Sequence, residues 1–247
     1  MTDDASVLGR ALSIVDAFAP GEPSLSLAEL ARRTGLPKST AHRFVTQLET
    51  LKVLERDGPR IRLGLRLFEW GSLVPRQRTM RDAALPFMED LYEATHETVH
   101  LGLLEDLEVV YVNKISGHQR THVPTSVGSR MPAHCTGLGK AILAFSPEAD
   151  VEATIARGLP AVTPSTIVSP ELFRAELAAA RRDGVAYDRA ESAAAVACVA
   201  APIRNTSGRA IAAISVTGPP PRIDVERLSP VVRFAALGLS RAMRGRS

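Results

Sequence analysis

The chain has only two cysteines and one tryptophan in 247 residues, and both scarcities exclude classes of protein. Cys135 and Cys198 cannot provide the disulfide framework of a small secreted domain, and their spacing fits no common metal motif. Aromatic residues make up 4% of the chain, which argues against the stacking surfaces that bind single-stranded nucleic acids. A protein that works in a reducing compartment is therefore expected.

Long apolar runs are also missing. The first residues, MTDDASVLGRAL, lack the apolar centre of a signal peptide, and no segment approaches the ~18 uninterrupted apolar residues of a membrane helix. We therefore expect a cytoplasmic protein. The net charge is only +3, so a surface that binds nucleic acid has to come from a local cluster of charge.

Residues 26–46 show the pattern of two short helices joined by a tight turn. Ser26 and Glu29 have the spacing of a capping box, and Gly35 supplies a stop with positive φ. The second helix then has one apolar face at helical spacing, made of Ala41, Phe44, Val45 and Leu48. This is the pattern of a helix-turn-helix.

The other face of that second helix offers groups suited to DNA. In a helix-turn-helix the second helix enters the major groove, where Arg can bind guanine and hydroxyls can bind phosphate. The candidate DNA contacts on this helix are Lys38, Ser39, Thr40, His42 and Arg43. The alternative is an ordinary helical hairpin whose polar residues only face water.

Residues 53–64 favour the DNA-binding interpretation. Two short alternating segments flank Asp57-Gly58-Pro59, as expected for a β-wing, and Arg60 and Arg62 become candidates for phosphate contacts. Between residues 32 and 66 there are nine Lys and Arg residues against three Asp and Glu residues. The positive surplus lies where a duplex would bind.

The rest of the chain predicts a second, larger domain. We expect helices over 7–18 and, after the wing, from 65 onward and over 80–95. Beyond residue 98 the pattern predicts strands over 99–104, 109–115, 198–204 and 210–217 with helices over 137–145, 170–183 and 225–243. This mixture indicates an α+β domain and not a doubly wound sheet. We assign residues 5–66 to a DNA-binding domain, 67–82 to a linker helix region, and 83–247 to ligand binding and oligomerisation.

The segment His96-Glu97-Thr98-Val99-His100 matches the H-E-x-x-H zinc motif in letters. That motif works on a helix, where both imidazoles share one face. Here the sequence changes from helical to strand spacing, and in a strand the two histidines would lie about 13 Å apart. A zinc hydrolase at His96 and His100 therefore remains only as a rival interpretation.

Other catalytic motifs are incomplete. Gly137-x-Gly139-Lys140 lacks the first glycine and the final hydroxyl residue of a phosphate loop. Cys198 lies in VACVAAPI, a buried-strand pattern in which a thiol is inert, although a Cys198-dependent enzyme is a second rival. We therefore expect no catalytic site, metal or cofactor.

Small polar groups interrupt otherwise apolar strands near the end of the chain. Asp188, Cys198, Ser215 and Thr217 belong to this set, and Ser215 and Thr217 point to the same side of one strand. Such groups indicate either a solvated sheet face or a ligand pocket with a few orienting donors, and the pattern leaves both open.

Five blocks in order resemble the IclR family of bacterial transcriptional regulators. They are LSLAELARRTGLPKSTAHRFVTQLE, ETVHLGLLEDLEVVYV, MPAHCTGLGKAILAF, GVAYDRAES with ACVAAPIRN, and AAISVTGP. The resemblance implies an N-terminal winged helix-turn-helix, a linker helix and a C-terminal GAF-like α/β effector domain. It also implies a homodimer or homotetramer that binds a palindromic double-stranded operator and responds to a small organic or aromatic acid.

The resemblance also implies where the effector binds. The residues at the matching positions are Val123, Met131, Gly137, Leu138, Asp188, Cys198, Ser215 and Thr217. Leu138 is bulkier than the small residue of relatives that bind very small keto acids.

A third rival interpretation is a DNA-binding protein whose second domain only oligomerises.

Overall fold

The computed structural model describes residues 6–18, 22–117, 125–220 and 222–244, and for residues 75–78 it describes the backbone only. The chain divides into two compact units, residues 1–78 and residues 79–247. Each unit has its own hydrophobic core.

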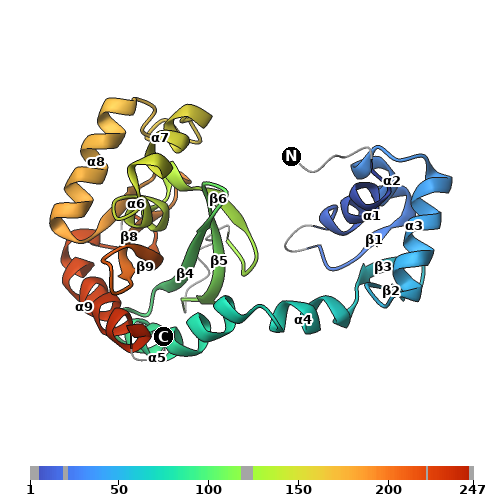
Figure 1. The fold of residues 1–247 in the computed structure, drawn as a ribbon, viewed down its shortest axis with the longest axis horizontal. Coiled ribbons are helices and arrows are strands. Elements are labelled where there is room, and N and C mark those ends of the chain that lie inside the picture. Colours follow the sequence, from blue (N-terminus) through green and yellow to red (C-terminus); the bar gives the residue numbers. More distant parts are fainter. Residues whose placement is uncertain (1–5, 19–21, 118–124, 221, 245–247) are drawn as a thin grey trace. The chain divides into compact units, whose positions relative to one another are not determined.

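The first unit combines the helices α1 to α4 with a small sheet. Its elements are α1 (Val7–Asp16), β1 (Leu25–Ser26), α2 (Leu27–Thr34), α3 (Lys38–Thr50), β2 (Leu54–Asp57), β3 (Arg60–Leu63) and α4 (Leu65–Ser72). The sheet is antiparallel in the order β1-β3-β2. The elements are labelled in Figure 1.

Local sequence explains the helix-turn-helix. The Ser26 hydroxyl accepts from the Glu29 amide and the Glu29 carboxylate accepts from the Ser26 amide, which closes the predicted capping box. Gly35 ends α2 in the left-handed region with φ 67°. The predicted apolar face of α3 is buried in the core.

The wing is a hairpin of β2 and β3, in which Arg56 faces Ile61 and Glu55 faces Arg62. Gly58 turns the chain with φ 58°. Gly64 ends the hairpin where the backbone of Lys52 approaches so closely that a β-carbon would lie 2.2 Å from the Lys52 carbonyl oxygen. Only glycine fits there without moving the backbone.

The second unit is built on a six-stranded antiparallel sheet in the order β6-β5-β4-β9-β8-β7. The strands are β4 (Thr98–Glu105), β5 (Glu108–Ile115), β6 (Arg130–Pro132), β7 (Ala186–Arg189), β8 (Ala197–Arg204) and β9 (Ala210–Gly218). The helices are α5 (Pro75–Thr95), the 3-10 turn η1 (Ala133–Cys135), α6 (Gly137–Leu143), α7 (Glu148–Arg157), α8 (Pro170–Asp183) and α9 (Val225–Arg244).

The two faces of this sheet carry different helices. One core packs α5 and α9 against Val99, Val199 and Val216, while a second core packs α6, α7 and α8 against the opposite face (Figure 1). Because successive side chains of a strand alternate between faces, His100 and Ser215 point to the α6 face while their neighbours enter the α9 core. This alternation positions the candidate site.

Most predicted elements are present with small changes at their ends. The structure adds β1, β6, η1 and α7, which the sequence pattern did not predict, and it begins α5 at Pro75, before the predicted start at residue 80. None of the described helices has the length and apolar character needed to cross a membrane.

Candidate functional site

The candidate DNA-binding residues of α3 lie on its outer side. Lys38, Ser39, His42 and Arg43 are exposed and Thr40 is half-buried, while Ala41 and Phe44 are buried beneath them. The guanidinium of Arg43 lies 5.5 Å from the centre of the Phe44 ring. This cation–π contact restricts the movement of the Arg43 side chain. The face therefore offers hydroxyl, cationic and imidazole groups to a partner.

The two wing arginines already have partners within the domain. Arg60 donates to the Ser24 hydroxyl at 2.9 Å and to the Ser24 carbonyl at 2.7 Å. Arg62 donates through two nitrogens to Glu55 at 3.1 and 3.0 Å. All four side chains stay exposed or partly exposed, so a phosphate would compete with these contacts and would not meet a free guanidinium.

A second candidate site lies between α6 and the sheet. Strand register builds it: Asp188 faces Cys198 on β7 and β8, Cys198 faces Thr217 on β8 and β9, and Ser215 faces His100 on β9 and β4. Polar residues that are far apart in sequence thereby become neighbours on one face. Helix α6 covers them and contributes Gly137 and Leu138.

His100 lies at the centre of the polar network in this pocket. One ring nitrogen, Nε2, is hydrogen-bonded to the Thr125 hydroxyl at 2.9 Å, and Nδ1 is hydrogen-bonded to the Thr217 hydroxyl at 3.3 Å. The Tyr111 ring meets the imidazole edge-on at 5.1 Å. Burial, with a smaller effect from the charge of Lys114, lowers the pKa of His100 to about 3. The imidazole is therefore neutral at physiological pH.

Asp188 brings a carboxylate to the pocket wall. It accepts from the Glu191 amide at 2.7 Å, from the Ser192 amide at 3.3 Å and from the Ser192 hydroxyl. Burial raises the pKa of Asp188, and these hydrogen bonds act in the opposite direction. The residue thus holds the turn after β7 and presents a hydrogen-bond acceptor at the wall of the cavity.

Ser215 has a buried hydroxyl that lies beside the thiol of Cys198, a weak hydrogen-bonding group. The side chain has no exposed surface, and its Oγ atom has no hydrogen-bond partner among the described residues. A buried unsatisfied polar group costs stability, so such a group in a pocket indicates the position of a ligand or water. Cys198 beside it is an inert thiol, because burial raises its pKa to about 12.

Lys140 connects α6 to the loop that follows β7. Its side chain has no exposed surface, and Nζ donates to Glu191 at 2.5 Å and to Glu176 of α8 at 3.3 Å. The Glu191 carbonyl is held by the Thr166 hydroxyl at 2.8 Å. These contacts keep the loop that carries Ser192 closed against the pocket.

The start of α6 depends on two glycines. A β-carbon on Gly139 would lie 2.2 Å from the Ala133 carbonyl oxygen, and one on Gly137 would lie 3.0 Å from the Cys198 sulfur. Thr136 caps the helix by accepting from the Gly139 amide at 3.1 Å. The Gly139 amide is therefore not available to an anionic ligand.

The structure brings together most residues that the sequence assigned to this pocket. Met131, Gly137, Leu138, Asp188, Cys198, Ser215 and Thr217 all line it, and Val123 lies outside the described residues. Sequence reasoning missed six further lining residues, which are His100, Tyr111, Thr125, Thr136, Ser192 and Val196. The cavity between the described side chains is about 20 Å³. That is room for about one water molecule, so a larger ligand has to displace side chains.

The zinc-like segment has a different role in the structure. Helix α5 ends at Thr95, His96 has φ 54°, and Thr98 begins β4. Glu97 accepts from Arg222 at 2.6 and 2.8 Å, and His100 belongs to the pocket. No cluster of three potential metal ligands occurs in the described part of the chain.

A winged helix-turn-helix joined to an α/β domain defines a class of DNA-binding transcriptional regulators. The chain belongs to the IclR family of bacterial transcriptional regulators. The family model "IclR helix-turn-helix domain" matches residues 7–58, and "Bacterial transcriptional regulator IclR C-terminal" matches residues 74–241. The family consists of regulators and not of enzymes.

Curated relatives and solved structures agree with this assignment. The chain is 33% identical to the HTH-type transcriptional regulator XynR of Escherichia coli over 240 residues, 95% of both chains. It is 35% identical to KipR of Bacillus subtilis, over 89% of this chain and 90% of that one. An IclR homologue from Microbacterium hydrocarbonoxydans, complexed with 4-hydroxybenzoate, has a TM-score of 0.88 at 32% identity and covers 97% of this chain and 100% of that one.

Proposed function

We propose that a small organic or aromatic acid binds the pocket of His100, Asp188 and Ser215 and changes the affinity of this regulator for its operator. The observation that carries the proposal is the unpartnered, buried hydroxyl of Ser215 facing a polar cavity. The 4-hydroxybenzoate bound to the Microbacterium homologue supports the choice of ligand class.

The pocket suits a ligand that carries both hydroxyl and carboxyl groups. Asp188 accepts hydrogen bonds, so a ligand hydroxyl fits beside it, whereas a carboxylate belongs beside the hydroxyls of Ser215 and Thr217. The small cavity requires Leu138 or Tyr111 to move when an aromatic ring enters. Such a ligand shifts operator binding only by its differential affinity for two arrangements of the protein.

The DNA-binding assignments belong to the same proposal. Arg43 and His42 read base edges, and Lys38, Ser39 and Thr40 contact phosphates near the start of α3. Arg60 and Arg62 contact phosphates of the flanking DNA backbone. To do so, Arg60 gives up its hydrogen bonds to Ser24 and Arg62 gives up its hydrogen bonds to Glu55. Double-stranded operator DNA is the partner.

A second copy of the chain completes the proposed regulator. In the first unit α4 has no buried residue, and Leu65, Phe68 and Leu73 are 65%, 70% and 75% exposed. Leu8 of α1 is 77% exposed. Large apolar side chains in this density indicate a protein–protein surface, so we assign α1 and α4 to a homodimer contact that suits a palindromic operator.

The test is thermal unfolding of the purified chain with a panel of acids that includes 4-hydroxybenzoate, benzoate and short keto and hydroxy acids. A ligand at about 100 times its Kd adds about 2.7 kcal/mol to the unfolding free energy, which raises the Tm by several degrees. Operator binding is then measured with and without each ligand that stabilises the protein.

Pocket variants decide whether the response comes from this site. We expect Asp188→Ala and Ser215→Leu to abolish stabilisation by the ligand and to leave operator binding unchanged. Thr206→Ala, at an exposed turn, serves as the control. A full ligand response in both pocket variants would place the effector elsewhere.

A further inference from the structure

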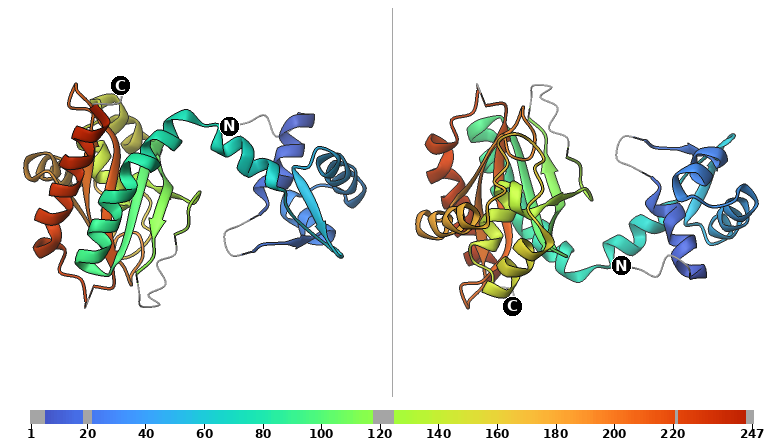
Figure 2. Two further views of the ribbon diagram at one scale, coloured as in Figure 1. Left: turned by 90° about the horizontal axis from the view of Figure 1, so that it is seen from below. Right: turned by 90° about the horizontal axis from the view of Figure 1, so that it is seen from above.

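A cleft lies between α6, α7 and α8 of the second unit. These three helices lie together on one side of the six-stranded sheet (Figure 2). The cleft has a volume of about 220 Å³, whereas the pocket of His100 has about 20 Å³. Gly137 and Leu138 at the start of α6 line the pocket, while Leu143 and Ala144 at its end line the cleft. The two cavities share no lining residue, so the cleft is a separate site.

The floor of the cleft is apolar. Leu143 has no exposed surface, and Val151 and Leu177 are 5% and 6% exposed. Ala144 and Ala178 also line the cleft, and their short side chains leave the space above the floor open. A cavity of about 150 Å³ holds benzene, so this cleft has room for about nine non-hydrogen atoms. A ligand of this size with a branched aliphatic group matches the floor.

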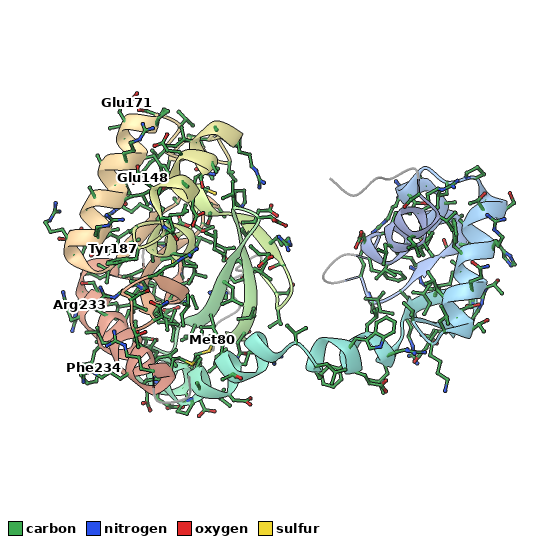
Figure 3. The ribbon with its side chains drawn as sticks, viewed as in Figure 1. Met80, Glu148, Glu171, Tyr187, Arg233 and Phe234 are labelled. Atoms are coloured by element: carbon green, nitrogen blue, oxygen red, sulfur yellow. The ribbon has the colours of Figure 1, made fainter. Side chains whose placement is uncertain are left out.

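Two contacts show that α7 and α8 run in opposite directions along the cleft. Arg181, near the end of α8, donates from Nε to the carbonyl of Ala144 at 2.6 Å, just before α7 begins. Arg174, about two turns earlier in α8, donates to Glu152 within α7 at 2.9 and 3.1 Å. Glu148 is the first residue of α7, where Figure 3 shows it. Glu148 therefore lies at the Arg181 end of the cleft.

Two opposite charges at this end have no ionic partner in the described part of the chain. Arg174 is already paired with Glu152 through two nitrogens. Arg181 uses only Nε, and its two terminal nitrogens have no partner among the described residues. The carboxylate of Glu148 forms no ion pair with them either. The cleft thus presents a positioned guanidinium and a carboxylate, both available to a ligand.

We propose that this cleft binds a free α-amino acid with a branched aliphatic side chain, of the size of valine, leucine or isoleucine. The carboxylate of the ligand accepts from the two terminal nitrogens of Arg181, which can donate as a parallel pair. Its ammonium group donates to the carboxylate of Glu148. Its side chain lies on the floor made by Leu143, Val151 and Leu177.

The position of the two charges selects this class of ligand. Because Glu148 and Arg181 lie at one end of the cleft, the cationic and anionic groups of the ligand have to be neighbours, as they are on one α-carbon. An acid without an amine leaves the carboxylate of Glu148 without a partner, and an amine without an acid leaves the guanidinium of Arg181 without one. Hydrogen bonds between charged groups contribute more than neutral ones, so both losses weaken binding.

Isothermal titration calorimetry of the full chain tests the proposal with three ligands of similar shape. They are L-leucine, isocaproate, which lacks the ammonium group, and isoamylamine, which lacks the carboxylate. We expect one leucine to bind per chain, and each analogue to bind at least tenfold more weakly. The proposal is overturned if leucine, valine and isoleucine all fail to bind at millimolar concentration, or if leucine and isocaproate bind equally well.

Two substitutions assign the two ends of the ligand. We expect Glu148→Gln to weaken leucine binding at least tenfold and to leave isocaproate unchanged, because isocaproate has no ammonium group. Arg181→Gln should weaken leucine and isocaproate but not isoamylamine. Glu171→Gln and Arg182→Gln are the matched controls, because both side chains are exposed and neither lines the cleft. Unchanged leucine affinity in Glu148→Gln or in Arg181→Gln contradicts the proposed contacts.

A third substitution separates this site from the pocket of His100. Ser215→Leu fills that pocket, and we expect it to leave the affinity for leucine unchanged. Leucine binding that disappears in Ser215→Leu, with an unchanged thermal melting curve, would place the amino acid in the pocket and overturn the assignment to the cleft. The acids proposed for the pocket are titrated separately, so their failure to bind does not affect this result.

Discussion

The ammonium group of Lys140, which has no exposed surface, lies 2.5 Å from the carboxylate of Glu191, whose second oxygen has no hydrogen-bond partner among the described residues. The pair joins α6, which covers the pocket, to the loop that carries Ser192. Both charges are buried, so each depends on the other for compensation.

Lys140→Met leaves the carboxylate of Glu191 buried without its cation. We expect the free energy of unfolding to fall by about 3–5 kcal/mol, as found when one partner of a buried pair is removed. Urea unfolding followed by circular dichroism measures this. The double variant Lys140→Met/Glu191→Leu removes both charges and should recover most of the lost free energy of unfolding. If it recovers none, the destabilisation does not come from the unpaired charge of Glu191.

His100 makes stability depend on pH in the acidic range. Its ordinary pKa is 6.5, and burial lowers the pKa in the folded chain to about 3. Below pH 6.5 the unfolded chain binds a proton at this residue that the folded chain does not bind. Stability therefore falls between pH 6.5 and 3, with a contribution of up to about 1.4 kcal/mol per pH unit.

The His100→Asn variant isolates this contribution. Burial raises the pKa values of Asp188 and Glu191, which favours proton uptake by the folded chain and opposes the effect of His100. We therefore compare the free energy of unfolding of the unsubstituted chain with that of His100→Asn, measured by urea unfolding at several pH values. If the two stability curves stay parallel below pH 6.5, His100 is not the responsible group.

Arg43→Ala tests base reading by α3. If the guanidinium binds a base, operator affinity should fall by about 1–3 kcal/mol while affinity for random duplex DNA changes little. Fluorescence anisotropy with both duplexes at one salt concentration measures the difference. Thr50→Ala, at the far end of α3, is the control. Equal losses on both duplexes would assign Arg43 to a phosphate.

Gly139→Ala tests the close approach of α6 to η1. Alanine ordinarily stabilises a helix by about 1 kcal/mol relative to glycine, but here its β-carbon meets the Ala133 backbone. We expect a net loss of about 1–3 kcal/mol, the usual cost of overpacking. Gly71→Ala in α4, with no atom within 4 Å of its β-carbon, should instead stabilise its own unit.

Two optical signals separate these effects. Trp70, the single tryptophan, reports unfolding of the first unit by fluorescence, while far-ultraviolet circular dichroism reports both units. If Gly139→Ala instead raises the free energy of unfolding, the backbone of η1 moves away from the new β-carbon at little cost.

Local sequence was sufficient for the helix-turn-helix. Its capping box, its glycine stop and the apolar face of α3 involve residues close together in the chain, so their spacing predicts them directly. The antiparallel strands beyond residue 98 were predictable for the same reason, because alternation is a local property. β6 and η1 were missed because they are short and lack a repeating pattern.

Tertiary structure decided which residues share the pocket. Asp188, Cys198, Thr217 and Ser215 were assigned to it through family resemblance, and strand register makes them neighbours. His100 was read with His96 as part of a zinc-like segment, although its alternation with Val99 and Leu101 was a signal for the pocket face. Only the pairing of β4 with β9 places it opposite Ser215.

The sequence by itself determined most of the helices, the longer strands and the DNA-binding motif, because capping, periodicity and turn chemistry act over a few residues. The partners of Lys140, the burial of His100 and the unpaired hydroxyl of Ser215 depended on the tertiary structure. They arise from contacts between segments up to 117 residues apart, and strand register and packing set those contacts where local spacing carries no information.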